Sequence, residues 1–138
     1  MHSGRVTIAC VVSAVCAPAC SAQGIEPTDV LEPFGVEESD EFGSVVEISS
    51  GTIAIAAPLD DDRGEDAGAV YLFSAEDGQL VNKLLPSPAP GGQFGQAICF
   101  FGDRIAVGAP MAAGGGTVYV FDVKSGEAIS SFVADGIS

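Results

Sequence analysis

The chain of 138 residues has few of the side chains on which many enzymes and nucleic-acid-binding proteins depend. It has no tryptophan, a single histidine, and 5 basic residues against 19 acidic ones, which gives a formal net charge of −14. An acidic surface of this kind repels nucleic acid and anionic lipid. Because His2 lies in a segment that we expect to be removed, histidine-activated nucleophiles and histidine metal ligands are excluded from the mature protein.

Cysteine is also scarce outside the first part of the chain. Cys10, Cys16 and Cys20 lie within the expected leader, which leaves Cys99 alone after cleavage at Ala22. An intrachain disulfide is then excluded, so the core must provide the stability. Cys99 lies in an apolar stretch and is expected to be a small buried hydrophobic residue.

The amino terminus has the pattern of a secretory signal peptide. Arg5 precedes a twelve-residue apolar stretch, Val6–Ala17, and small residues follow it. The stretch is well short of the roughly 20 residues of a membrane-spanning helix, and no longer run follows, so we expect no membrane span. Cleavage is expected after Ala19 or Ala22. The first cut would expose Cys20 as in a lipoprotein, but the residues before it match that signal poorly, so lipidation is the minor alternative. The predicted location is secreted, periplasmic or at the cell surface.

Two parts of the chain repeat each other. Residues 40–58 align without a gap on residues 92–110, at an offset of 52, and residues 68–73 align on residues 116–121. The first copy is four residues longer, and the extra residues all lie in an acidic loop. Self-similarity of this kind marks a repeat architecture in which each copy is one small structural unit.

Each copy has the pattern of a β-meander. Four short apolar runs are separated by Gly, Asp, Ser or Pro, and no long stretch has helical periodicity. The pattern predicts an all-β fold of two four-stranded antiparallel blades of a β-propeller-like array. The inner strands are apolar on both faces and need cover on both, so their aromatic residues are assigned to packing: Tyr71, Phe73, Tyr119 and Phe121. The expected strands are 44–49, 52–57, 69–74, 80–85, 96–101, 104–109, 117–123 and 128–134.

The repeated motif resembles a known family. Phe94-Gly95, an apolar strand, Gly108-Ala109-Pro110 and then Gly116-x-Val-Tyr-x-Phe are similar to the FG-GAP repeat, and the first copy has Ala56-Ala57-Pro58 at the tripeptide. The resemblance implies a β-propeller of the kind found in integrin alpha chains and many exported bacterial proteins. The calcium loop of integrin-like members does not carry over, because residues 45–51 and 97–103 lack its Asp-x-Asp-x-Asp-Gly spacing.

Two blades are fewer than the roughly four to eight of a closed propeller. Uncovered faces and unpaired strand edges invite association, so we expect either self-association or further repeats, and Ala134-Asp135-Gly136 is like the start of a third copy. The array is therefore expected to be incomplete or part of a larger assembly. The predicted organisation is a signal peptide at 1–22, an acidic segment with a candidate outer strand (Asp29–Pro33) at 23–39, and repeats at 40–91 and 92–138.

The acidic loop is the main candidate site. Calcium prefers six to eight oxygen ligands, and several carboxylates here could supply them, namely Asp60, Asp62, Glu65 and Asp66. Against this, Arg63 interrupts the run and neighbouring aspartates would point in different directions. The alternatives are a solvated loop, the usual fate of such charge, and a catalytic cluster. The loop has no acidic counterpart in the second copy, so forming a blade does not require it.

These observations favour an exported, non-enzymatic repeat module that binds a protein, a glycan or a mineral ion, or that has a structural role. No catalytic or cofactor-binding residue is assigned, and no cofactor is expected apart from weakly bound calcium. The alternative is a carboxylate-dependent hydrolase on a propeller scaffold.

Overall fold

Turns rich in glycine and aspartate divide the chain into short strands. The computed structural model describes residues 30–31, 33–86 and 92–134. Gly78 and Gly126, at the same place in the two copies, take φ values of 70° and 74°, a left-handed conformation that suits glycine. A short 3₁₀ helix, η2 (Glu38–Asp40), precedes the strands. In the described part these are β1 (Val46–Ser49), β2 (Thr52–Ala57), β3 (Ala69–Ser74), β4 (Leu80–Leu84), β5 (Ala97–Phe101), β6 (Arg104–Ala109), β7 (Thr117–Asp122) and β8 (Ala128–Val133).

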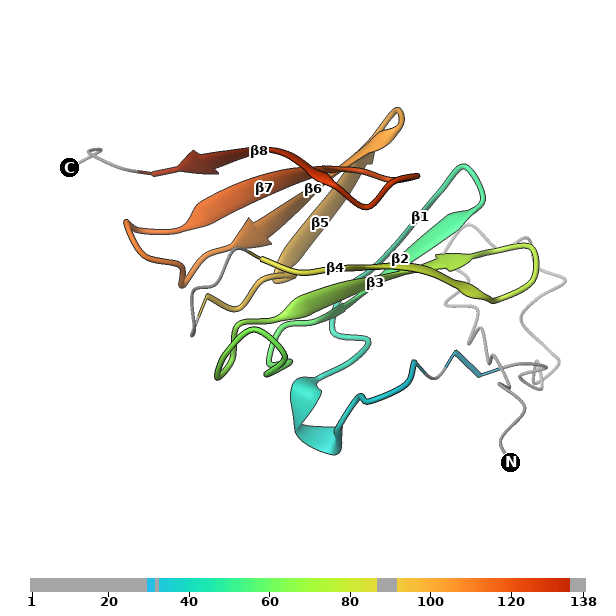
Figure 1. Ribbon diagram of the computed structural model, residues 1–138, viewed down its shortest axis with the longest axis horizontal. Coiled ribbons are helices and arrows are strands. Elements are labelled where there is room, and N and C mark those ends of the chain that lie inside the picture. Colours follow the sequence, from blue (N-terminus) through green and yellow to red (C-terminus); the bar gives the residue numbers. More distant parts are fainter. Residues whose placement is uncertain (1–29, 32, 87–91, 135–138) are drawn as a thin grey trace, which may run out of the picture. The chain divides into compact units, whose positions relative to one another are not determined.

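The strands form two four-stranded antiparallel sheets, each a simple meander in the order of the sequence (Figure 1). The registers are equivalent: Ala56 pairs with Val70 in the first sheet, and Gly108 pairs with Val118 in the second. Each sheet also has a register shift at the same place, after Leu72 and after Val120. The predicted all-β fold of two four-stranded antiparallel, propeller-like blades is confirmed, and the two sheets do not form a closed ring.

The predicted strands agree with the observed ones, and no bound differs by more than two residues. Contacts divide the chain into two units, residues 1–34 and 35–138, and both sheets lie in the second. In the candidate outer strand, Val30 occupies a single β-bridge position and Leu31 lies outside any strand. Asp29, Glu32 and the expected signal peptide at 1–22 lie outside the described residues. None of the described helices has the length and apolar character needed to span a membrane.

One core joins the two sheets. We call the face of each sheet that carries its Tyr-x-Phe pair the front, and the opposite face the rear. The rear of the first sheet and the front of the second share a buried cluster. The four aromatic residues assigned to packing are all buried, as predicted. The cluster contains Ala54, Ala56, Val70, Leu72 and Leu84 from the first sheet, and Ile98, Ile105, Val107, Tyr119 and Phe121 from the second.

A Phe-Gly turn makes the joint between the sheets. Phe94 is fully buried, and its ring lies edge-on to Tyr119 and Phe121, at centroid distances of 5.4 and 5.7 Å. Its backbone forms a parallel β-bridge with Gly68, and its N–H donates to the carbonyl of Ala67 at 2.9 Å. The turn of the second repeat thus rests on the β2–β3 loop of the first.

Cys99 corrects one expectation. It is exposed, whereas its neighbour Ile98 is buried at 8% exposure, because successive residues of β5 point to opposite faces. Cys99 lies on the rear of the second sheet, where Val118 is 43% exposed. The prediction of a buried Cys99 was wrong because Cys99 lies on the outer strand of this face, where it is exposed, whereas Val120 nearer the centre of the same face is buried at 8% exposure.

Candidate functional site

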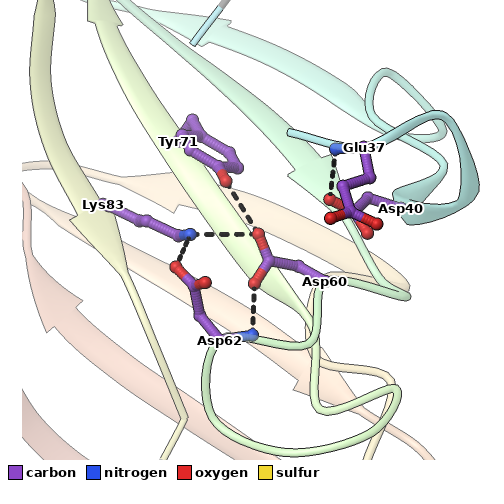
Figure 2. Close-up of polar contacts among 6 residues, drawn as sticks. All are labelled: Glu37, Asp40, Asp60, Asp62, Tyr71 and Lys83. Atoms are coloured by element: carbon purple, nitrogen blue, oxygen red, sulfur yellow. Dashed lines mark hydrogen bonds and ion pairs between the residues drawn. The ribbon is translucent and has the colours of Figure 1, made fainter. Parts of the chain in front are cut away.

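The acidic loop, residues 58–68 between β2 and β3, contains one buried carboxylate. Asp60 is 2% exposed and accepts a hydrogen bond from the hydroxyl of Tyr71 at 2.7 Å (Figure 2). The ammonium of Lys83 lies 3.0 Å from the same Asp60 oxygen and also pairs with Asp62. The other Asp60 oxygen accepts the backbone N–H of Asp62 at 2.9 Å. Tyr71, Lys83 and these two aspartates form one connected cluster, which we call the Asp60 cluster.

The fold brings these residues together from three elements. Asp60 follows a tight turn, in which its N–H donates to the Ala57 carbonyl, and its own carbonyl accepts the N–H of Gly68 to close the loop. Tyr71 in β3 and Lys83 in β4 are directly paired across the sheet, so their side chains emerge on the same face. The ammonium also lies 4.8 Å from the centroid of the Tyr71 ring. Residues far apart in the sequence therefore meet at one end of the first sheet.

The second repeat closes its loop in the same way without the cluster. Ala112 donates to the carbonyl of Ala109 and accepts from Gly116, as Asp60 does with Ala57 and Gly68. Ala112 thus occupies the place of Asp60, and Ser131, the cross-strand partner of Tyr119, occupies the place of Lys83. The Asp60 cluster is therefore an addition to the common repeat, which accompanies its longer loop.

The cluster strengthens the ionised state of its charged members. Burial disfavours charge on Asp60, but hydrogen bonds from the Asp62 N–H, the Tyr71 hydroxyl and Lys83 outweigh it and hold the pKa of Asp60 below its ordinary 3.8. Burial and the bond to Asp60 raise the pKa of Tyr71 from 10.0 to about 12. For Lys83, burial favours the neutral amine, but the bonds to the carboxylates outweigh it and raise the pKa above its ordinary value.

Two of the four candidate calcium ligands lie against a cation that the chain itself provides. Asp60 and Asp62 converge on Lys83 (Figure 2), whose positive charge lies where a metal ion would have to bind. Asp61 has a different role, because its carboxylate accepts the N–H of Asp66 and shapes the loop. Among the described residues, no group of three or more His, Cys, Asp or Glu side chains is placed to hold a metal ion.

The arrangement offers little acid–base chemistry near neutral pH. A general base needs a pKa near the working pH, whereas Asp60 is held ionised and already accepts three donors. Tyr71 stays protonated, and Lys83 stays an ammonium rather than a nucleophilic amine. The bonds of Asp60 to Tyr71 and Lys83 instead hold the acidic loop against β3 and β4 of the first sheet.

Sequence reasoning finds the loop but misses two members of the cluster. The sequence pattern assigns Tyr71 to packing only and gives Lys83 no role. A signal is present, because the extra loop residues and a lysine in place of Ser131 occur in the same copy. Asp60 stands where the second copy has Ala112, a buried position, and an aspartate placed there requires partners.

Comparison with known proteins agrees with the fold. Residues 30–73 match the family described as FG-GAP repeat, a region that includes β1, β2 and all of β3 except Ser74. A search of curated proteins found no match to the chain. The family match ends before β4 of the first repeat, and the second sheet has the same strand order and register as the first. The chain therefore contains an FG-GAP repeat at residues 30–73.

Proposed function

We propose that this protein is an exported, non-enzymatic repeat module that binds a protein or a glycan, or serves a structural role, through its loops. The observation that carries the proposal is the internal pairing of the Asp60 cluster. Its two buried titratable groups, Asp60 and Tyr71, are bonded to each other, and Asp60 is also paired with Lys83, which supports a structural role for the cluster. The repeat fold provides a rigid scaffold, and loops on such scaffolds commonly carry binding residues.

The β2–β3 loop is the part of the first repeat best suited to contact a partner. Its outer carboxylates, on Asp61, Asp62 and Glu65, are exposed, while Asp60 anchors the loop from within. The anchoring restricts the loop before any partner arrives, which lowers the entropy lost on binding. Its charge favours partners with basic or hydrogen-bond-donating surfaces and disfavours nucleic acid.

The described residues support binding over a carboxylate-dependent hydrolase. Hydrolysis by two carboxylates needs one acid and one base whose pKa values are separated by their surroundings. Of the buried aspartates, Asp60 is paired with the ammonium of Lys83 and accepts the Tyr71 hydroxyl, and Asp40 accepts the N–H of Glu37 at 2.8 Å. Each of these two is engaged with a local donor.

A capture experiment with the purified chain as bait tests the binding role. We expect a partner from the cell envelope or culture medium to be retained saturably, and an Asp61→Asn, Asp62→Asn, Glu65→Gln variant to retain it more weakly. A matched variant, Glu76→Gln and Asp77→Asn, alters exposed carboxylates of the β3–β4 turn and should retain the partner as well as the wild type. Hydrolase activity that is lost on Asp62→Asn would contradict the proposal.

Export is tested by sequencing the amino terminus of the mature protein. Arg5, the apolar stretch Val6–Ala17 and the small residues after it support cleavage after Ala19 or Ala22. Loss of Arg5 leaves 5 − 1 = 4 basic residues against 19 acidic ones, so the mature chain would carry a formal charge of −15. Mature protein that still begins at Met1 or His2 would rule export by this signal out.

A further inference from the structure

The rear of the second sheet carries a hollow of about 610 Å³. It lies between the start of β5, the β6–β7 loop and the end of β8. The residues that form its floor and sides are small or apolar, and they include Ala97, Gly108, Gly116, Thr117, Val118 and Phe132. An apolar hollow on an otherwise strongly acidic protein is a surface that water covers poorly.

The same place in the first sheet is occupied by the Phe94-Gly95 turn. Gly108, Gly116 and Val118 correspond to Ala56, Gly68 and Val70 by the repeat alignment and by strand register.

Gly68 touches the Phe94 backbone so closely that a Cβ on Gly68 would lie 2.2 Å from the Phe94 carbonyl oxygen. A Cβ on Gly95 would lie 3.0 Å from the Ala56 Cβ and 3.3 Å from a Val70 methyl group. The hollow is thus the equivalent seat for a Phe-Gly turn.

The apolar side chains around the hollow are much more exposed than their counterparts in the first sheet. Val70 and Leu84 are 0% and 1% exposed beneath the second repeat, whereas their counterparts Val118 and Phe132 are 43% and 63% exposed. Burying such apolar side chains stabilises an interface in proportion to the area removed from water. The rear of the second sheet therefore has the chemistry of the first sheet's rear without its covering partner among the described residues.

The first repeat exposes a turn of matching shape. Glu41 and Gly43 have φ values of 56° and 97°, close to the 52° of Gln93 and the 105° of Gly95. In both turns the glycine N–H donates to the second strand of its own sheet, to Ala56 or to Gly108. The Phe42-Gly43 turn therefore has the backbone conformation that occupies the seat in the first sheet.

The strand beside this turn is also open. Val46 is 49% exposed and Ile48 is 61% exposed, whereas Ile98, the counterpart of Val46, is 8% exposed against the first sheet. β5 lies next to β1 where the two sheets meet, so the first strand of a repeat is the part that contacts the preceding repeat. The centre of the first sheet's front is already covered, with Tyr71 at 1% exposure, and its β1 margin is the part that remains available.

We propose that the rear hollow of the second sheet binds the Phe42-Gly43 turn and the β1 margin of a second copy of this chain. The backbone of the incoming phenylalanine packs against Gly116, as the backbone of Phe94 packs against Gly68. The contact is head-to-tail, so its two sides are different surfaces, and copies can add until a ring closes. The surfaces follow from the repeat geometry and do not depend on the proposed export or binding role.

Two valine substitutions test the two sides separately. Val118→Asp places a charge in the hollow, and Val46→Asp places one on the β1 margin; both residues are about half exposed in the single chain, so folding should survive. Leu80→Asp, at 46% exposure and outside the hollow, is the matched control. Circular dichroism and thermal unfolding establish that each variant is folded, and Val118→Ser and Val46→Ser replace any variant that is not.

Sedimentation velocity gives the readout, over a range of concentrations and at an ionic strength that screens repulsion between acidic copies. We expect the wild type and Leu80→Asp to associate. Each valine variant alone should have an association constant at least about tenfold lower than that of the wild type. A mixture of the two variants should form a complex of two chains and stop there, because each supplies the side that the other lacks. A wild type that stays a single chain throughout, or a mixture that forms no complex, would overturn the proposal.

Discussion

Gly68→Ala should destabilise the protein strongly, because the joint between the two sheets leaves no room for a side chain at this position. The added Cβ would lie 2.2 Å from the carbonyl oxygen and 2.6 Å from the nitrogen of Phe94, and backbone atoms cannot rotate out of the way as a side chain can. The two sheets would have to move apart, and the Phe94 ring would lose part of its packing. We expect the free energy of unfolding to fall by at least about 3 kcal/mol beyond the cost of the backbone conformation itself.

Gly51→Ala is the control for that conformational cost. Gly51 has φ 79°, near the 88° of Gly68, but a Cβ there would meet no atom within 4 Å. Gly51→Ala should lower the free energy of unfolding by about 1–2 kcal/mol, which is the cost of a left-handed conformation for a residue with a side chain. Urea unfolding of both variants measures the difference. Equal losses would show that Gly68 is needed only for its φ value and that the joint tolerates a side chain.

Asp60→Ala should be the second large effect. Alanine is the residue that the second repeat has at this place, Ala112, so the backbone turn tolerates it. What is lost is the partner of the Tyr71 hydroxyl and one of the two carboxylates paired with Lys83. Leaving a buried hydroxyl unpaired and removing the largely buried ion pair between Asp60 and Lys83 should cost about 3 kcal/mol of unfolding free energy.

Further variants separate the cluster from general charge effects. Glu65→Ala removes an exposed carboxylate from the same loop and should change stability by less than about 0.5 kcal/mol. Asp60→Ala with Lys83→Ser reproduces the pair found in the second repeat, Ala112 with Ser131. Because the ammonium has then gone as well, the double variant should lose less than the sum of the two single losses, by about 1–2 kcal/mol. Strict additivity would contradict the coupling between Asp60 and Lys83.

The effect of Asp60 should also depend on pH. Its folded-state pKa lies below the ordinary 3.8, so the stability it provides is complete above that value and is lost as the pH falls through the folded-state pKa. Wild type and Asp60→Ala should therefore converge in stability in acid. In a Tyr119→Phe background, tyrosinate absorbance reports Tyr71 alone, with a pKa of about 12 that should fall toward 10 in Asp60→Asn.

The strand pattern could be predicted closely because local rules determine it. In β2 and β6, large and small side chains alternate, and turns that contain glycine lie on both sides of each strand. Equivalent positions of the two copies have the same pattern, so each copy supports the strand assignment of the other. A register set by such alternation has few alternatives, because a slip of one residue would turn Ile53 and Ile55 to the opposite face. The positions of the observed strands therefore agree with the sequence pattern to within two residues.

The side-chain partnerships could not be predicted in the same way. Lys83 and Asp60 are 23 residues apart, and their meeting depends on the pairing of β3 with β4 after a register shift. The prediction for Cys99 failed for a related reason. Alternation along β5 gives two faces, but which face is covered depends on the neighbouring sheet, and one repeat cannot specify that alone.

The meander order has a consequence for how the chain folds. Every strand pairing in the described chain joins strands that are neighbours in the sequence, so each sheet can form from contacts that require only short loops to close. The bridge between Gly68 and Phe94 joins residues that are farther apart in the sequence. Phe94 has no backbone partner there until the β2–β3 loop has formed. Each repeat is thus expected to acquire its strands locally and quickly, and docking of the two repeats to be the later, slower event.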